Sequence, residues 1–200
     1  MHWADEGYLL SKNNFDENSI IIEAFTLEHG KYTGIVYGGS SRKQKRNFQI
    51  GNKILLNWHS KGENKFGYFN SELIKPISPF FFDDKKRSIC ILSASSLLKI
   101  LLPERQINKI IYHSLENMFI ELESDDWINL YIHWELSLIK ELGYEISFFD
   151  NNNLNKQKIS HIEINNKSLK IPDIFLYKDL KKKFLRKKIY EALVFNKNLL

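Results

Sequence analysis

The sequence is poor in the residues and motifs that metal-binding and catalytic proteins use. Its 200 residues include a single cysteine, Cys90, which can neither form an internal disulfide nor build a closed zinc site. This cysteine lies in an apolar run that is typical of a core. No GxxxxGK[ST] phosphate-binding loop, GxSxG elbow or HExxH pair is present. We therefore expect no bound metal, no cofactor and no enzymatic activity.

Long apolar runs are also missing. A membrane-spanning helix needs about 20 consecutive apolar residues, and no segment approaches that length. The first residues, Met1 to Glu6, are polar and acidic, which does not fit a secretory signal. We expect a cytoplasmic protein that does not interact with membranes.

Charge is present but unevenly distributed. Residues 1–30 carry six acidic side chains and one basic side chain, whereas residues 31–61 carry seven basic side chains and no acidic one. Such a window can create a local positive potential that attracts a polyanion. The alternative is a solvated surface in a chain that is rich in lysine. The seven basic residues are Lys31, Arg42, Lys43, Lys45, Arg46, Lys53 and Lys61.

Short β-rich runs separated by turn residues fill the first part of the chain. Five strands in about 75 residues, without a long helix, indicate a small barrel, and the OB-fold is the commonest five-stranded barrel of that size. An SH3-like barrel fits the same pattern. The predicted strands are residues 7–10, 19–27, 32–37, 53–58 and 66–74.

After residue 88 the apolar period changes from two to about 3.6, which predicts helices. We predict helices at 89–102, 106–122, 127–142 and 180–194, and a hairpin formed by 160–164 and 168–171. The chain is thus predicted to be α+β and multi-domain. The predicted divisions are a barrel domain at 1–78, a linker at 79–87 and a helical domain at 88–200, with the hairpin subdomain at 148–172 and a basic terminal helix at 180–195.

The basic window interleaves cations with aromatic rings, as proteins that bind single-stranded nucleic acid do. Tyr32 and Phe48 fit a core equally well. The basic terminal helix extends a DNA path or is a solvated face; a basic amphipathic helix can also bind a membrane surface, which ranks third here because its polar side lacks an exposed aromatic residue. The predicted DNA-binding residues are Lys31, Arg42, Lys43, Lys45, Arg46, Lys53, Trp58, Lys181, Lys182 and Arg186.

Several segments, in the right order over residues 1–145, resemble the RecO family of recombination and repair proteins. The opening WADEGYLL is similar to the family's W-x-D-E-G-x-x-L, and TLEHGK at 26–31 is similar to its T-x-E-H-G-K/R. Gly38-Gly39-Ser40-Ser41-Arg42 resembles its G-x-R/S-S turn. Gln49-Ile50-Gly51 matches Q-P-G except that isoleucine replaces proline. The helical part carries similar segments at 102–104 (LPE) and from Trp134 to Tyr144.

The resemblance implies an N-terminal OB domain, a C-terminal helical domain and a bacterial, nucleoid-associated location. It implies binding of single- and double-stranded DNA, annealing of complementary strands, and loading of RecA together with RecR onto strands coated by single-stranded-DNA-binding protein (SSB). Lys99, Arg105 and Lys109 are our candidates for binding the acidic SSB tail. Many relatives carry a four-cysteine zinc site after the LGY segment, but residues 148–171 contain no cysteine. We expect a zinc-less subdomain.

Two other functions fit the composition. One is an RNA-binding OB-fold protein of the translation apparatus. The other is a nuclease, or another enzyme, whose carboxylates are far apart in the sequence. Competition between DNA and RNA oligomers separates the first from DNA repair, and a cleavage assay with magnesium or manganese tests the second.

Overall fold

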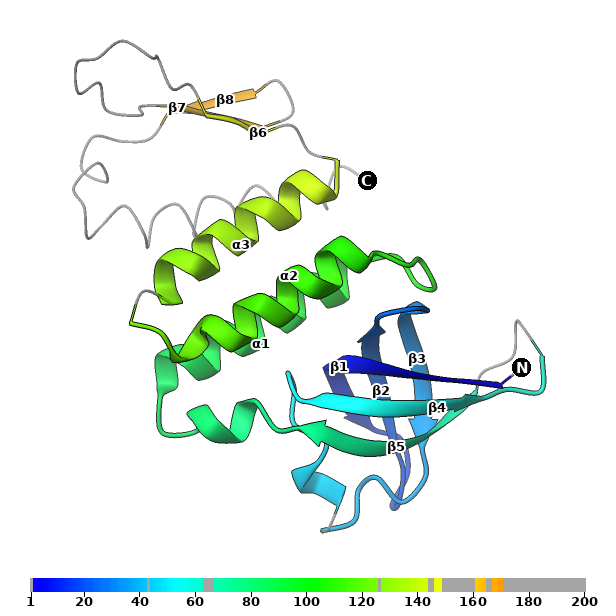
Figure 1. The fold of residues 1–200 in the computed structure, drawn as a ribbon. Helices are drawn as coiled ribbons and strands as arrows, with labels where there is room; N and C mark the ends of the chain where they lie inside the picture. The colour runs from blue at the N-terminus through cyan, green and yellow to red at the C-terminus, as the bar shows by residue number, and fades with distance from the viewer. Residues whose placement is uncertain are drawn as a thin grey trace. The chain divides into compact units, whose positions relative to one another are not determined.

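The computed structural model describes residues 2–42, 44–62, 67–125, 127–143, 146–148, 161–164 and 167–170. The chain divides into two compact units, Met1–Phe119 and Ile120–Leu200. The first unit contains five strands followed by two long helices, and the second contains one long helix and a small sheet (Figure 1). This order agrees with the predicted α+β class.

The five strands of the first unit form one closed sheet. They are β1 (His2–Asn14), β2 (Ile20–Thr26), β3 (Gly30–Val36), β4 (Lys53–His59) and β5 (Tyr68–Lys75), in the order β1-β2-β3-β5-β4. The sheet closes because β1 pairs antiparallel with both β2 and β4. Only β3 and β5 pair in parallel, through Ile35 and Tyr68.

Alternation of apolar and polar residues sends one side of each strand into the barrel. In β4 every second residue is buried, and Trp58 fills the interior against Phe69, with the two ring centroids 4.8 Å apart. Gly34 of β3 makes room for this pair, since a Cβ there would lie 2.5 Å from the Trp58 ring. The core comprises Trp3, Leu9, Ile20, Ile22, Ala24, Tyr32, Val36, Phe48, Ile54, Leu56, Trp58 and Phe69.

Two helices belong to the same unit as the barrel: α1 (Lys85–Leu101) and α2 (Lys109–Ile120). Asp84 caps α1 by accepting hydrogen bonds from the backbone N–H groups of Lys86 and Arg87. The helix therefore begins inside the predicted linker, which also overlaps the short 3₁₀ helix η2 (Ser78–Phe81). Tyr112 of α2 packs against Tyr8 and Phe25 of the barrel.

These contacts explain why the first compact unit extends to Phe119. The predicted division at residues 79–87 follows a change in sequence period, whereas the first unit is held together by aromatic packing between strands and helices. Asn52 adds a polar link, because its Oδ1 accepts hydrogen bonds from the backbone N–H groups of Ile77 and Ser78.

The second unit begins with η3 (Glu121–Glu123) and α3 (Trp127–Glu141). Gly143 follows α3 in the left-handed conformation, with φ of 86°, which is typical of the residue after a helix. β6 (Ile146–Phe148), β7 (His161–Ile164) and β8 (Lys167–Lys170) form an antiparallel sheet in that order. The predicted hairpin is present as β7 and β8, and β6 was not predicted. The predicted terminal helix lies outside the described residues.

Candidate nucleic-acid interface

The loop between β3 and β4 carries most of the exposed cations of the basic window. We call residues 38–47 the basic loop; it leaves β3 through Gly38, whose φ is 73°, and contains the 3₁₀ helix η1 (Gln44–Arg46). In Figure 1 this loop, in light blue, lies below the five strands. Arg42, Lys45 and Arg46 are all exposed on it. Lys43 lies outside the described residues.

The basic loop is anchored at both ends. At its start, the backbone N–H groups of Gly39 and Ser41 donate hydrogen bonds to Val36 and Gly38. At its end, Phe48 is buried in the barrel core. Between them, Lys45 N–H donates to the carbonyl of Ser41, and Gln49 Nε2 donates to the carbonyl of Lys45 at 2.7 Å. The described residues of the loop thus hold Arg42, Lys45 and Arg46 on an anchored backbone.

Lys12 of β1 adds a cation to this site. Its ammonium group donates a hydrogen bond to the carbonyl of Phe48, at the end of the loop. Partial burial lowers the pKa of Lys12 below the usual lysine value, and the positive charge of Lys45 lowers it further. This repulsion would be relieved by an anion between the two. The sequence analysis missed Lys12, because it is the only base among six acids in residues 1–30.

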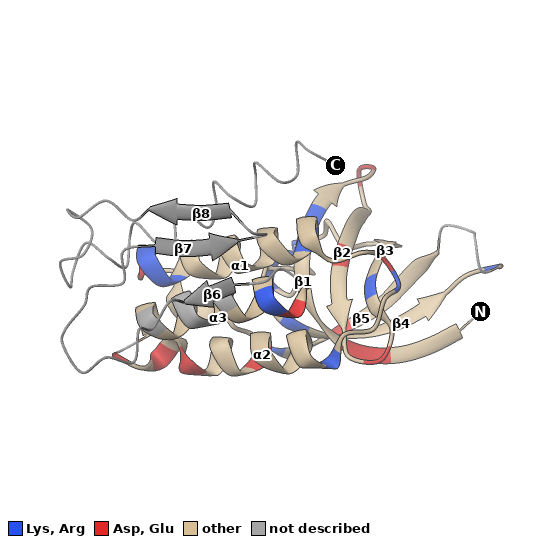
Figure 2. Ribbon diagram, turned by 90° about the horizontal axis from the view of Figure 1, so that it is seen from above, with Lys and Arg blue, Asp and Glu red and all other residues tan. Residues whose placement is uncertain are grey.

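The cations of the basic loop are not neutralised by neighbours. Among the described residues, Arg42, Lys45 and Arg46 take part in no ion pair. Charged positions are seen on both the strands and the helices (Figure 2), so their number alone does not locate a binding site. Lys75, Lys85 and Lys86 are also exposed and take part in no ion pair with the residues that the structure describes. What distinguishes this loop is that three such cations lie within residues 42–46, next to Lys12.

Three predicted DNA-binding residues point elsewhere, and we correct their assignment. Lys31 is only 7% exposed, and its ammonium group donates to the carbonyl of Lys99 near the C-terminal end of α1. Cations are stabilised there because the last carbonyls of a helix carry partial negative charge. Trp58 is buried in the barrel core. Lys53 is held in ion pairs. None of the three belongs to an exposed binding surface.

Lys53 joins the barrel to α2. Its ammonium group lies 2.8 Å from Glu116 Oε1 of α2 and 2.9 Å from Glu6 Oε2 of β1. The Tyr8 hydroxyl also donates to Glu116. Burial alone would lower the pKa of Lys53, but the hydrogen bonds to Glu116 and Glu6 raise it. Burial alone would raise the pKa of Glu116, but the hydrogen bond from Lys53 lowers it.

The residues predicted to bind an acidic tail also contact the barrel. Lys99 pairs with Glu23 at 2.9 Å, and Lys109 pairs with Glu28 at 2.6 Å. The Arg105 guanidinium lies over the Tyr32 ring, 5.5 Å from its centroid. An acidic peptide would have to displace Glu23 and Glu28 from the two lysines. Binding of such a tail here stays a prediction.

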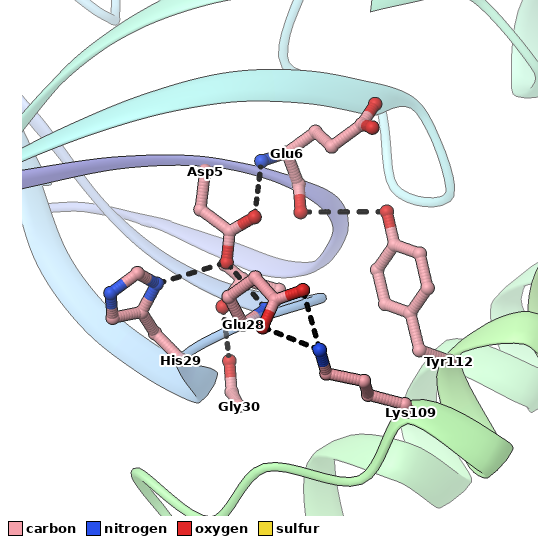
Figure 3. A network of polar contacts seen from close by, with 8 residues as sticks. Asp5, Glu6, Glu28, His29, Gly30, Lys109 and Tyr112 are labelled. Carbon is pink, nitrogen blue, oxygen red and sulfur yellow. Dashed lines mark hydrogen bonds and ion pairs between the residues drawn. The ribbon is translucent and has the colours of Figure 1, made fainter.

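The DEG segment at 5–7 and the EHG segment at 28–30 form a structural network (Figure 3). Asp5 Oδ2 accepts hydrogen bonds from the Glu28 backbone N–H at 2.7 Å and from His29 Nδ1 at 3.0 Å, while its Oδ1 accepts from the Glu6 N–H. Gly30 has a φ of 76°, and a Cβ there would lie 2.2 Å from the carbonyl oxygen of Gln106. These residues fix the turn between β2 and β3.

The remaining predicted cations, Lys181, Lys182 and Arg186, lie outside the described residues. Within the part of the chain that the structure describes, no group of three or more His, Cys, Asp or Glu side chains is placed to hold a metal ion. No helix among the described residues is both long and apolar enough to cross a bilayer.

Comparison with known families and proteins gives a consistent result. The family model "Recombination protein O N terminal" matches residues 1–77, and "Recombination protein O C terminal" matches residues 83–182. A protein of Ruegeria sp. (strain TM1040), described as DNA repair protein RecO, is 33% identical over 145 residues, which are 72% of this chain and 60% of the relative.

Two further relatives carry the same description. That of Wolbachia pipientis wMel is 33% identical over 150 residues, 73% of this chain and 61% of the relative. That of Rhodospirillum centenum is 26% identical over 148 residues, 74% of this chain and 59% of the relative. The chain thus spans about three fifths of the length of the relatives it matches.

Proposed function

The chain belongs to the RecO family, and from this premise we propose that it is a DNA-binding mediator of recombinational repair. It binds single- and double-stranded DNA and brings complementary strands together for annealing. The observation that carries the proposal is the anchored basic loop, on which Arg42, Lys45 and Arg46 are exposed and unpaired by acids among the described residues. The family comparisons favour DNA repair over a role in translation.

We assign the barrel to the OB-fold. The support is its strand order, β1-β2-β3-β5-β4, with β1 closing on β4 and a single parallel pair between β3 and β5. Small five-stranded barrels of this kind bind oligonucleotides on their strands and loops. The basic loop joins two strands of this barrel and so lies where a nucleic-acid strand can follow it.

The mechanism we propose is electrostatic and needs no covalent chemistry. Two DNA strands repel each other through their phosphates, and cations on the loop screen that repulsion so that pairing can nucleate. Each phosphate that is neutralised releases counterions. For each such phosphate, the slope of the logarithm of the binding constant against the logarithm of the salt concentration becomes steeper by about 0.9 for a duplex and about 0.7 for a single strand. On this account the protein is not an enzyme, and annealing requires neither a metal nor ATP.

The partners we propose follow from the family. With RecR, the protein would help RecA to load onto single strands that SSB covers. The acidic SSB tail would bind near Lys99, Arg105 and Lys109. To do so, its carboxylates would replace Glu23 as the ion-pair partner of Lys99 and Glu28 as that of Lys109. The RecO relatives are longer than this chain, which covers 60% of the Ruegeria protein. We therefore propose these contacts for the whole protein.

The test removes the three exposed loop charges together. We expect R42A/K45A/R46A to weaken binding to single strands and duplexes and to lower the salt slope by about 2–3 on duplex DNA. The matched control is K75A/K85A/K86A, which removes the same charge from three exposed positions outside the loop. Equal slopes for the loop variant and the wild type would refute the assignment, as would equal losses in the two triple variants.

A further inference from the structure

Four rings form a row on the outside of the barrel, three from neighbouring strand positions and one from the residue that follows β3. We call His2, His59, Tyr68 and Tyr37 the ring row. His2 of β1 pairs directly with His59 of β4, and His59 pairs with Tyr68 of β5. Tyr37 follows the end of β3. It lies near Tyr68 because Tyr68 pairs with Ile35, two residues before Tyr37. The row thus crosses the strands instead of following one of them.

The rings are in contact along the whole row. The ring centroids of His2 and His59 are 4.5 Å apart and those of His59 and Tyr68 are 4.9 Å apart, with interplanar angles of 28° and 15°. The rings of Tyr68 and Tyr37 are 5.7 Å apart and tilted by 55°. The first three rings therefore form a column, and the ring of Tyr37 is inclined to it at one end.

The ring row is not part of the barrel core. Strand alternation buries the neighbouring Trp3, Trp58 and Phe69 and turns the ring row outward. Tyr68 is 37% exposed and Tyr37 is 64% exposed. Packing between paired strands accounts for a single cross-strand pair. It does not account for Tyr37, which lies beyond the last residue of β3.

The residues next to the ring row are basic or uncharged, which favours binding of a polyanion with unpaired bases. Tyr37 immediately precedes the basic loop, so the row continues into Arg42, Lys45 and Arg46 along the chain. The next outward positions on β1, β4 and β5 are uncharged: Ala4, Asn57 and Asn70, which pair with one another. The acidic residues of this face, Glu6 and Glu72, come one position further along the strands.

We propose that the ring row is a stacking site for the unpaired bases of a single nucleic-acid strand whose phosphates follow the basic loop. This inference rests on the proposed function and deepens it, because it assigns strand selectivity to particular residues. Aromatic side chains stack on any base, since every base has a π-face. The inner faces of the column are covered by the neighbouring rings, so a base stacks at an end of the row, above all on Tyr37, which is 64% exposed. The bases of a duplex are already stacked and paired, so a duplex uses only the loop cations. A single strand uses both.

The test compares single strands with duplexes. We expect Y37L and Y68L each to weaken binding of a fluorescein-labelled oligothymidine about tenfold, with no change in its salt slope and none in binding of a duplex of equal length. Y68F keeps the ring and should bind like the wild type. F82L is the matched control, because Phe82 is an exposed aromatic residue between η2 and α1.

A second measurement begins with the wild type alone, and this part does not depend on how well the variants fold. An oligonucleotide with abasic sites keeps its phosphates but has fewer bases to stack, so the wild type should bind it less tightly than oligothymidine. Y37L, altered at the most exposed ring, should lose most of that discrimination. Three results would overturn the stacking site. The first is that the ring variants lose equal affinity for single strands and duplexes, and the second is that Y68F binds oligothymidine less tightly than the wild type. The third is that the wild type binds abasic and intact strands equally well.

The two proposals fail in different ways. If the wild type binds neither single strands nor duplexes, the proposed function fails. If the wild type binds both and the ring variants bind oligothymidine normally, the stacking site alone fails, and the row is a packing feature of the barrel.

Discussion

The contact between Lys53 and Glu116 gives the sharpest prediction about stability. Glu116 Oε1 accepts hydrogen bonds from Lys53 Nζ at 2.8 Å and from the Tyr8 hydroxyl at 3.1 Å, and it ties α2 to the barrel. Breaking a fully buried ion pair costs about 3–5 kcal/mol, and exposed pairs contribute about 1 kcal/mol or less. The Glu116 side chain is 28% exposed, so we expect K53M to lower the free energy of unfolding by about 2 kcal/mol and E116Q by about 1 kcal/mol.

The pH dependence of this contact has a definite sign. The folded-state pKa of Glu116 is lowered, so its stabilisation is complete above the ordinary carboxyl pKa of about 4.3 and is lost as the pH falls through the lowered value. The folded-state pKa of Lys53 is raised, so its contribution is complete at every pH below about 10. A protonated Glu116 resembles glutamine. We therefore expect the deficit of E116Q to be largest near neutral pH and to disappear in acid.

Urea unfolding at several pH values, followed by fluorescence and circular dichroism, measures these differences. The double variant K53M/E116Q completes a thermodynamic cycle, for which we expect a coupling energy of about 1 kcal/mol at pH 7. A coupling energy of zero, or a deficit of E116Q that is the same at pH 7 as in strong acid, would refute the reasoning.

Two further predictions concern the barrel. G34A should lower the free energy of unfolding by about 1–3 kcal/mol, because the new Cβ would lie 2.5 Å from the Trp58 ring; a variant as stable as the wild type in urea would show that the ring can move aside. D5N should cost about 1–3 kcal/mol, because both Asp5 oxygens accept hydrogen bonds, and in either orientation the amide nitrogen would face an N–H donor, that of Glu6 or those of Glu28 and His29. Hydrogen exchange of the turn between β2 and β3 should accelerate in D5N, and unchanged exchange would remove Asp5 from its structural role.

Strand and helix types were predictable where a single face is buried. β4 alternates regularly, and its predicted range, 53–58, is one residue shorter than the observed strand. β1 was predicted as residues 7–10 but spans His2–Asn14. Its residues from Gly7 to Ser11 are all buried, because α2 covers the outer side of Tyr8 and the register shifts between Leu9 and Ser11. A strand that is buried on both sides loses the alternation that identifies it.

The charge pattern located the basic loop but not the direction of each side chain. Lys31 and Lys53 belong to the same window as Arg42, yet both are used within the first unit, by the end of α1 and by Glu116. Nothing local in the sequence distinguishes them, because Lys99 and Glu116 are more than 60 residues away from Lys31 and Lys53, and Glu6 is 47 residues away from Lys53. The ring row is equally hidden, since strand pairing alone brings His2 beside His59.

On our proposal, cations of the basic loop bring nucleic-acid strands together electrostatically, without a covalent step. The most direct test is the annealing rate of two complementary labelled oligonucleotides, measured by fluorescence in EDTA, without ATP, over a range of salt concentrations. We predict that the protein accelerates annealing, that the acceleration falls steeply with salt, and that R42A/K45A/R46A loses most of it while K75A/K85A/K86A keeps it. Annealing that is independent of salt, or undiminished in the loop variant, would contradict the account.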